Sequence, residues 1–308
     1  MMQRIKLRDV RVLMAVAEYS SMGKAAARLA VSQPAVSKAI AAIEHTLGVP
    51  LFDRTYQGVE PTIYGRALLK WARACVDDLE QGVREIEFLA DPSAGEITIG
   101  TTEAMTAGLV PAVIDRLSQR FPRLAFNVMQ ARNIADQYRD LRERTVDLVF
   151  GRIGNQELDD DVKVEKLFDD PLLVVAGASN KWARRRKIDP ADLMNEPWCL
   201  PNFEGWVRSQ IAESFRAKGL QMPRRTVAST SIQLFTALMA TGRFLAFLSG
   251  STMRLSGARL GLKVVPVDLP TSRGPVGVVT LRNRTVTPVV QLFIECAREV
   301  AKPLAKGQ

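Results

Sequence analysis

The first fifty residues carry apolar positions at the spacing of α-helices. An amphipathic helix is predicted over residues 7–18, and an alanine-rich stretch predicts a short second helix over residues 22–30, with Ser20 or Ser21 as its N-cap. The face of the first helix that we expect to point inward comprises Leu7, Val10, Met14 and Ala17.

A third helix is predicted up to about Leu47, because Ser32 is a good N-cap, Pro34 suits a first helical turn and Gly48 suits a helix end. Its expected buried stripe comprises Val36, Ile40, Ile43 and Leu47. Its expected solvent face comprises Gln33, Ser37, Lys38, Ala41 and His45.

A short helix, a tight turn and a helix with a small, polar outer face form the layout of a helix-turn-helix, whose second helix enters the major groove of DNA. Gln33 can bond an adenine edge through two hydrogen bonds, and Ser37 and Lys38 can reach bases or phosphates. The alternative is an ordinary three-helix packing element whose polar face is simply solvated. Periodicity alone leaves both interpretations open.

One long helix is predicted over residues 62–89, with apolar or small residues at alternating spacings of four and three. A stripe this narrow suits burial by a second chain, while packing of the helix on its own domain is the alternative. Cys75 belongs to the stripe and is interpreted as a small buried residue rather than a redox sensor. The stripe comprises Leu68, Ala72, Cys75, Leu79, Gly82, Ile86 and Leu89.

From Glu96 onward, predicted strands and helices alternate, which is typical of an α/β fold with parallel strands and right-handed crossovers. The succession 97–100, 109–121, 125–130, 135–143 and 146–150 predicts one lobe, and a second set of strands and helices follows from residue 172. Two such lobes leave a cleft between them, as in periplasmic-type binding proteins.

Composition removes several classes of function. The chain has 308 residues, a net charge of +9 and a single histidine, His45, so catalytic triads and multi-histidine metal sites are not expected. Residues 1–75 hold 11 basic against 5 acidic side chains, a local excess of +6 that suits a nucleic-acid partner. Three cysteines without a CxxC pair and no leader or membrane span predict a cytoplasmic protein with no cofactor and no metal.

The segment from Ala25 to Gly65 resembles the DNA-binding domain of the LysR-type transcriptional regulators. The matching run reads Ala-Ala-x-x-Leu-x-Val-Ser-Gln-Pro-Ala-Val-Ser-Lys from Ala25, and continues through Ile40, Ile43-Glu44, Leu47-Gly48-Val49, Leu51-Phe52, Arg54, Gly58-Val59, Thr62 and Gly65. The sequence departs from the family pattern at Leu13-Met14, a core position, and at Pro61, which puts the wing contacts in question. The resemblance implies an all-α N-terminal winged helix-turn-helix that contacts double-stranded DNA through Ser32, Gln33, Pro34, Ser37, Lys38 and, on the wing, Arg54.

The resemblance also implies a dimerising linker helix, usually within a homotetramer, and a small-molecule effector in the C-terminal cleft. Ligands of open α/β sheets bind at the carboxyl ends of strands, so we expect effector contacts from Thr101, Thr102, Arg152, Asn202, Phe203, Trp206, Ser231 and Ser249. Thr101 and Thr102 also match the family's effector positions. Thr102 alternatively only caps a helix, and Arg152 alternatively only bridges the lobes.

Segments around Pro171, Lys181, Glu196 and Gly242 resemble the subgroup related to the galactose-binding-protein regulator, which indicates a sugar or sugar-acid effector, with a small aromatic or hydroxy acid as the alternative. We therefore predict a DNA-binding domain at 1–62, a linker helix at 63–91 and a two-lobed effector domain at 92–308. The lobes are expected near 96–165 with 268–308, and near 166–267. The rival functions are a transport-type solute binder and an enzyme.

Overall fold

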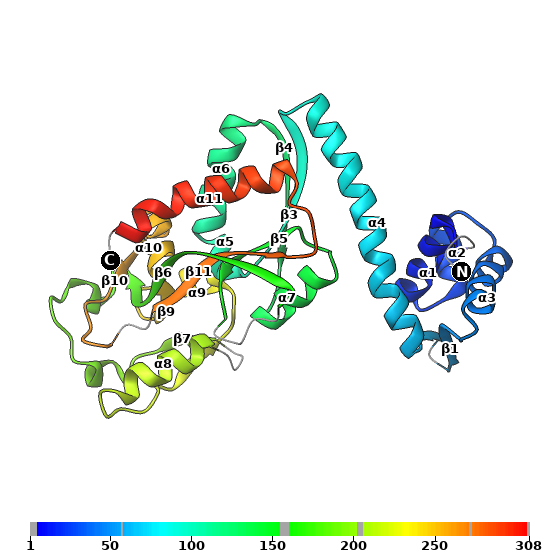
Figure 1. Ribbon diagram of the computed structural model, residues 1–308. Helices are drawn as coiled ribbons and strands as arrows, with labels where there is room; N and C mark the ends of the chain where they lie inside the picture. The colour runs from blue at the N-terminus through cyan, green and yellow to red at the C-terminus, as the bar shows by residue number, and fades with distance from the viewer. Residues whose placement is uncertain (1–4, 57, 155–159, 202–205, 271–272, 307–308) are drawn as a thin grey trace. The chain divides into compact units, whose positions relative to one another are not determined.

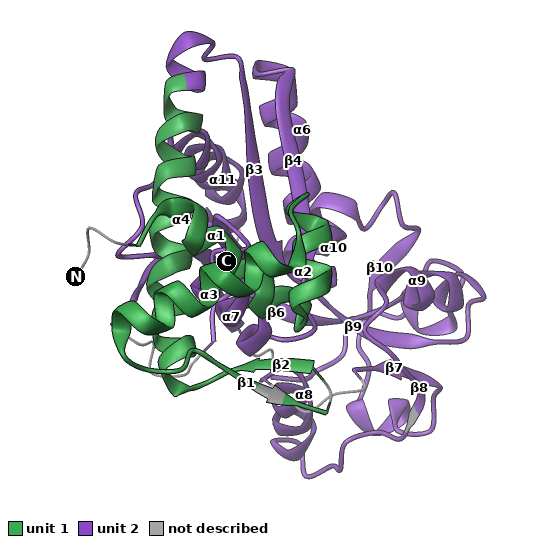
Figure 2. Cartoon of the chain, turned by 90° about the vertical axis from the view of Figure 1, so that its right-hand side faces the viewer, with its two compact units in different colours: residues 1–86 green, residues 87–308 purple. Residues whose placement is uncertain are grey.

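A computed structural model describes residues 5–56, 58–154, 160–201, 206–270 and 273–306 (Figure 1). The chain divides into two compact units, residues 1–86 and 87–308, and the division falls inside one long helix (Figure 2). Each unit has its own hydrophobic core.

Unit 1 contains three short helices and a two-stranded antiparallel hairpin, followed by most of a long helix. Ser21 and Ser32 cap the second and third helices through their side chains, and Gly48 ends the third helix in the left-handed conformation, at φ 73°. The elements are α1 (Leu7–Tyr19), α2 (Met22–Arg28), α3 (Gln33–Leu47), β1 (Phe52–Thr55), β2 (Gly58–Pro61) and α4 (Ile63–Ala90).

The core of unit 1 confirms the predicted buried side of α3 and confirms that of α1 in part. In α3, Val36, Ile40 and Ile43 are buried, as expected. In α1, Leu7 is exposed, whereas Val10, Met14 and Ala17 are half-buried against the core. The most deeply buried residues of α1 are Val12, Leu13, Ala15 and Val16. The segment is apolar almost all round from residue 12 to residue 17, so periodicity alone did not select the face that packs on α2 and α3.

Unit 2 is built on one mixed sheet in which β6 is common to both lobes. The described strands follow the order β4-β3-β5-β11-β6-β9-β7-β8, with β10 beside β6. The strands are β3 (Ala94–Thr101), β4 (Arg123–Gln130), β5 (Leu148–Arg152), β6 (Val162–Gly177), β7 (Trp198–Leu200), β8 (Arg225–Ala228), β9 (Leu245–Ser249), β10 (Leu262–Val264) and β11 (Arg273–Leu281). The pairs β3–β4, β3–β5, β7–β8 and β7–β9 are parallel, as predicted, whereas β6 and β11 run antiparallel to their neighbours.

Strand β6 is much longer than the predicted strand at 172–176, because its first half pairs with β11 and its second half with β9. Strands β6 and β11 are called the crossing strands below. Helices cover both faces of the sheet: α6 and α11 lie on one face near β3, and α7 on the other (Figure 1). The helices are α5 (Glu103–Thr106), α6 (Leu109–Arg120), α7 (Ile134–Arg142), α8 (Trp206–Arg216), α9 (Ile232–Ala240), α10 (Gly250–Ser256) and α11 (Pro288–Lys306), with short 3-10 turns at Lys181–Arg184 and Pro190–Leu193. No helix in the described ranges is both long and apolar enough to cross a bilayer.

Candidate DNA-binding surface and effector cleft

The solvent side of α3 is the first candidate site. Ser32, Gln33, Pro34, Ser37 and Lys38 are all exposed, and they lie on the first two turns of the helix or at its cap. The Ser32 hydroxyl accepts a hydrogen bond from the amide of Ala35, at 3.4 Å, which fixes the start of the helix. A helix held in this way presents amide, hydroxyl and ammonium groups at one end, which are the groups that read base edges and phosphates.

Glu44 ties α3 to the β1–β2 hairpin, which we call the wing. Its Oε1 atom accepts hydrogen bonds from the amides of Leu51, at 2.7 Å, and Phe52, at 3.3 Å. Leu51 is fully buried. The sequence motif contained Glu44, but only the structure shows that its carboxylate sets the position of the wing relative to α3.

Two glycines of the motif, Gly58 and Gly65, are required by close backbone approaches. Gly58, at φ 132°, lies against the Ser20 carbonyl oxygen, where an added Cβ would overlap that atom. Gly65 in α4 lies against the Leu51 carbonyl oxygen in the same way. The Thr62 hydroxyl donates to the Pro50 carbonyl, at 2.7 Å, and accepts from the Gly65 amide, at 3.0 Å. Thr62 and Gly65 therefore hold the start of α4 against the Pro50–Leu51 backbone that leads into the wing.

Arg54 lies in β1, as expected for a wing residue, and its side chain is outside the described part of the structure. Further exposed basic residues of unit 1 include Arg8, Arg11, Lys24 and Arg28. These cations can add contacts to phosphates that carry no sequence information.

The hydroxyls of two predicted effector residues, Thr101 and Ser249, form hydrogen bonds inside the fold. Thr101 at the end of β3 is fully buried, and its hydroxyl donates to the Phe150 carbonyl at 2.7 Å. Ser249 at the end of β9 is also buried, caps α10, and lies 2.8 Å from the Thr252 hydroxyl. We correct both assignments to structural roles. Where the end of a strand packs against its neighbours, a buried hydroxyl forms hydrogen bonds with backbone groups inside the fold and does not face a ligand.

Other predicted effector residues line the junction of the two lobes. The Arg152 guanidinium stacks on the Trp206 ring, 4.5 Å from its centroid, and donates to the Asp170 carbonyl at 3.3 Å. Gly274 lies against both side chains, where an added Cβ would be 2.6 Å from the indole. Arg152 and Trp206 come from different lobes, so the structure does bring them together. Asn202 and Phe203 lie outside the described residues.

Glu103, which the sequence analysis missed, connects the lobes directly. Its Oε1 atom accepts a hydrogen bond from the Ile232 amide in the first turn of α9, at 2.7 Å. Ser231 caps the same helix by accepting from the Leu234 amide, at 3.2 Å. Thr102 is half-buried at the N-cap of α5, without a side-chain capping bond. Glu103 directly follows Thr101-Thr102 and is the first residue of α5, so the strand-end rule pointed to its neighbourhood.

Charge at this junction centres on Asp170, which is almost fully buried. Its carboxylate accepts hydrogen bonds from the Ser251 amide, at 2.8 Å, and the Ser251 hydroxyl, at 2.5 Å. Burial raises the pKa of Asp170, while the bonds from Ser251 and the charge of Arg152 partly offset that rise. Burial likewise lowers the pKa of Arg152, against the attraction of Asp170. A half-buried cation stacked on an indole suits binding of a small anion or a sugar ring.

The described residues include no group of three or more histidine, cysteine or acidic side chains arranged around a common metal position. The junction of the two lobes offers hydrogen-bonding groups, a cation and an aromatic face, and these groups are suited to binding a small molecule.

Two family models match the chain. Residues 7–66 match the model described as "Bacterial regulatory helix-turn-helix protein, lysR family", and residues 90–302 match the "LysR substrate binding domain". Together these matches take in α3, the wing and both lobes.

Sequence similarity to known proteins extends over nearly the whole chain. The HTH-type transcriptional regulator GbpR of Azospirillum brasilense is 28% identical over 298 residues, which is 96% of this chain and 86% of GbpR. The HTH-type transcriptional regulator TfdS of Cupriavidus pinatubonensis is 28% identical over 308 residues, 99% of this chain and 100% of TfdS.

Solved structures show the same fold. A full-length OxyR variant from Pseudomonas aeruginosa has a TM-score of 0.68 at 22% identity and covers 96% of this chain and 98% of its own. The regulator CbnR in complex with its target DNA has a TM-score of 0.65 at 19% identity, covering 96% and 99%. The predicted fold class, and the prediction of a regulator rather than an enzyme, are confirmed by the family models and the relatives. The chain belongs to the LysR family of transcriptional regulators.

Proposed function

We propose that this regulator binds double-stranded DNA at an interrupted inverted repeat through α3 and the wing, and that a small molecule between the two lobes changes the geometry of that binding. The observation that carries the proposal is the exposed polar end of α3, capped by Ser32 and fixed to the wing by Glu44. Ser32, Gln33, Pro34, Ser37, Lys38 and Arg54 are the proposed DNA contacts. Since chromosomal DNA is the target, the proposal assigns the chain to the cytoplasm.

The DNA-binding proposal is tested with the purified full chain on an operator-containing duplex labelled for fluorescence anisotropy. We expect Gln33→Ala to lose about 1–3 kcal/mol on the operator and to relax preference at one base pair. We expect Arg54→Ala to weaken binding evenly across sequences, because a phosphate contact carries no base information. Glu18→Ala, which removes an exposed carboxylate of α1, is the control for a side-chain change on the same unit. Binding by Gln33→Ala that matches the wild type would contradict the proposed recognition face.

We propose that the effector is a sugar, a sugar acid or a small aromatic acid. Arg152 supplies a cation for an acid group, Trp206 supplies an aromatic face, and the proposed residues Thr102, Ser231, Asn202 and Phe203 supply the remaining contacts. Resemblance to the galactose-binding-protein regulator subgroup favours the sugar classes. Isothermal titration of the full chain with galactose, galacturonate and benzoate distinguishes the three classes. Arg152→Gln should remove affinity for the two acids and spare a neutral sugar.

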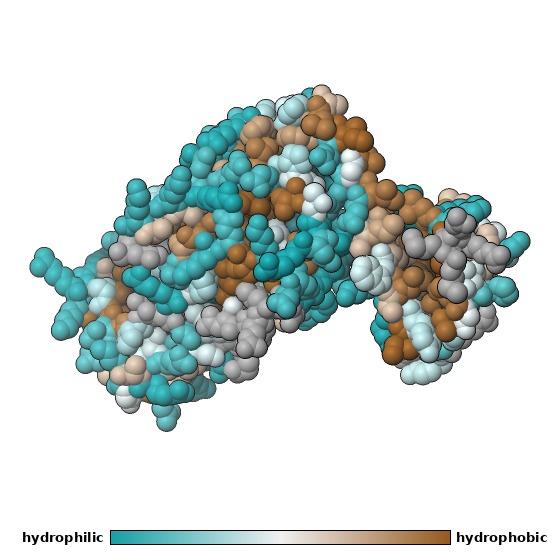
Figure 3. Space-filling view, viewed as in Figure 1, coloured by the Kyte–Doolittle hydropathy of each residue, from teal (hydrophilic) through white to brown (hydrophobic). Residues whose placement is uncertain are grey.

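We propose that α4 joins two copies of the chain. Its second half presents an apolar stripe that no described residue covers: Leu79, Val83, Ile86 and Leu89 are each at least 53% exposed. Figure 3 shows hydrophobic residues along the visible side of this helix. Cys75 lies on the same stripe and is exposed, so its predicted burial requires a partner. Leu79→Asp with Ile86→Asp should lower the mass measured by light scattering, whereas an unchanged mass would contradict the seam. A homotetramer is the assembly that we propose.

We propose that each of the three predicted segments has its own role. Residues 1–62 bind DNA, 63–91 join the copies and 92–308 bind the effector, with lobes at 96–165 with 268–308 and at 166–267. The position of the unit boundary inside α4 supports a linker role for that helix.

A further inference from the structure

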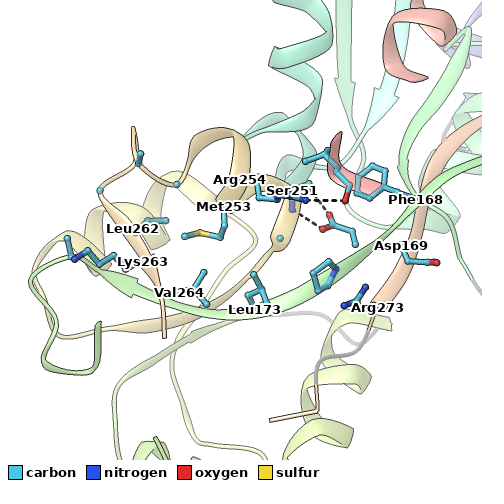
Figure 4. Close-up of a pocket in the computed structure, with 18 residues that line it drawn as sticks. Phe168, Asp169, Leu173, Ser251, Met253, Arg254, Leu262, Lys263, Val264 and Arg273 are labelled. Atoms are coloured by element: carbon cyan, nitrogen blue, oxygen red, sulfur yellow. Dashed lines mark hydrogen bonds between the residues drawn. The ribbon is translucent and has the colours of Figure 1, made fainter. Parts of the chain in front are cut away.

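A cavity lies beside the crossing strands and reaches Asp170, next to the Arg152–Trp206 stack. It has a volume of about 600 Å³ and is lined by β6, α10, β10, the first residue of β11 and the end of α11. Figure 4 shows its lining side chains. Its apolar members include Phe168, Leu173, Met253, Leu262, Val264 and Leu304. A volume of this size holds a ligand of drug-like dimensions.

Strand alternation places Arg273 and the Arg152–Trp206 stack on opposite faces of the crossing strands. Gly274 pairs with Asp170 and faces Arg152 and Trp206. Arg273, the preceding residue of β11, pairs with Pro171 and lines the cavity. Because successive side chains of a strand point to opposite faces, Arg273 points away from the Arg152–Trp206 stack. Arg273 therefore belongs to the cavity and not to the stack, whereas Asp170, which pairs with Gly274, borders both the cavity and the junction.

The side chains around the cavity leave an excess of positive charge. Both acidic members are engaged: Asp170 accepts two hydrogen bonds from Ser251, and Asp169 pairs with Lys166 at 2.7 Å. The basic members are Arg254, Lys263 and Arg273. Lys263 and Arg273 are exposed, and within the ranges that the structure describes neither side chain makes an ion pair or hydrogen bond.

Arg254 donates to the Leu304 carbonyl at the end of α11, at 3.2 Å, which holds this cation at the cavity wall. Figure 4 shows Lys263 and Arg273 at opposite ends of the apolar lining. An anionic group at either end can therefore meet a cation while an apolar body covers Met253 and Leu262.

Small residues keep the cavity open. Ala178, Gly250, Gly257, Ala258 and Gly261 all belong to its lining. Gly257 cannot carry a larger side chain, because an added Cβ would overlap the Met253 carbonyl oxygen. Gly261 has a positive φ of 65°, which favours glycine in the turn that leads to β10. Ala258, by contrast, is exposed and has room for replacement, so it offers a position from which the cavity can be filled.

We propose that this cavity is a second binding site, for an amphipathic organic acid: an apolar body bearing a carboxylate or sulfonate. Apolar surface binds the body, and Lys263 or Arg273 binds the acid group. The cavity adjoins the proposed effector site at Asp170, but Lys263 and Arg273 are not among the proposed effector contacts, so the proposal does not depend on which effector binds there.

The probe is the fluorescent acid anilinonaphthalene sulfonate, titrated into the full-length chain. Its neutral analogue phenyl naphthylamine has the same rings without the sulfonate. We expect saturable binding of the acid, and binding of the neutral analogue that is about tenfold weaker, since a charge-assisted bond is lost. Lys263→Gln with Arg273→Gln should weaken the acid about tenfold and leave the neutral analogue unchanged.

Three control variants distinguish dye bound in this cavity from dye bound elsewhere on the chain. Arg185→Gln with Arg186→Gln removes two exposed cations elsewhere in the same unit and should change nothing. Ala258→Trp should abolish binding of both dyes, and Trp206→Ala, in the cleft, should abolish neither. Circular dichroism confirms that each variant is folded. If Ala258→Trp does not fold, the affinity of the Lys263→Gln and Arg273→Gln double variant for the acid is the test of the proposal. Wild-type affinity in that variant, or loss of binding in Trp206→Ala, overturns the proposal.

Discussion

Replacing Glu44 by alanine tests how the wing is attached to the recognition helix. In the structure, one carboxylate oxygen of Glu44 accepts the amide hydrogens of both Leu51 and Phe52, at 2.7 and 3.3 Å. Leu51 is fully buried and Phe52 is half-buried, so water does not readily replace the lost acceptor at the first amide. Glu44→Ala therefore leaves at least one buried donor without a partner.

The magnitude follows from the two bonds. A buried donor left unsatisfied costs about 1–3 kcal/mol, and the Leu51 amide should bear most of this cost because its bond is the shorter and more buried. Adding a smaller contribution from Phe52, we expect the free energy of local opening at the start of the wing to fall by about 3 kcal/mol. This corresponds to roughly a hundredfold increase in the opening constant.

Hydrogen exchange by mass spectrometry on the full-length chain measures this opening in peptides that contain Leu51 and Phe52. Glu44→Gln keeps a side-chain carbonyl oxygen as acceptor, so it should retain most of the protection. Glu18→Ala removes an exposed carboxylate from α1 and should exchange like the wild type. The reasoning is refuted if Glu44→Ala exchanges at the wild-type rate, or if Glu44→Gln is as damaging as Glu44→Ala.

Three further predictions concern stability and thiol chemistry. Gly65→Ala should lower the thermal midpoint of the DNA-binding unit by several degrees, because the new Cβ overlaps the Leu51 carbonyl oxygen; an unchanged midpoint in calorimetry would contradict that contact. At neutral pH, Cys75 should react with iodoacetamide in the dissociated chain and Cys199 should not, since burial raises the pKa of the Cys199 thiol to about 11; peptide mapping distinguishes the two sites. The raised pKa of Cys199 also makes the folded state pH-dependent, because the buried thiol is more stable protonated. This contribution to stability is fully present below pH 9.0, the ordinary thiol pKa, and is lost as the pH rises towards about 11. The difference in unfolding free energy between wild type and Cys199→Ala should therefore change between pH 9.0 and about 11 and stay constant below that interval.

Local rules predicted the DNA-binding unit well because its signals are local. Ser32, Pro34 and Gly48 mark the ends of α3, and the spacing of Val36, Ile40 and Ile43 fixes its buried side. The face of α1 was predicted only in part, because the segment from residue 12 to residue 17 is apolar almost all round, and which side is buried most deeply depends on α2 and α3. No local signal revealed that the Glu44 carboxylate serves the wing.

The effector cleft was less accessible from sequence. The strand-end rule selected the correct loops, but it did not distinguish a hydroxyl that faces a cleft from one used inside the fold, as in Thr101 and Ser249. The length of β6 also escaped prediction, because its pairing first with β11 and then with β9 is a long-range property. Arg152 and Trp206 were both selected, but their stacking across the lobes depends on Gly274, which is far from either in the sequence.

The central claim is that the exposed end of α3 reads DNA sequence, and selection of bound duplexes from a random-sequence pool by the purified full chain tests it most directly. We predict enrichment of an interrupted inverted repeat, with preference lost at one position of each half-site in Gln33→Ala. Absence of any enriched sequence at low salt, from a chain that circular dichroism shows to be folded, would contradict it.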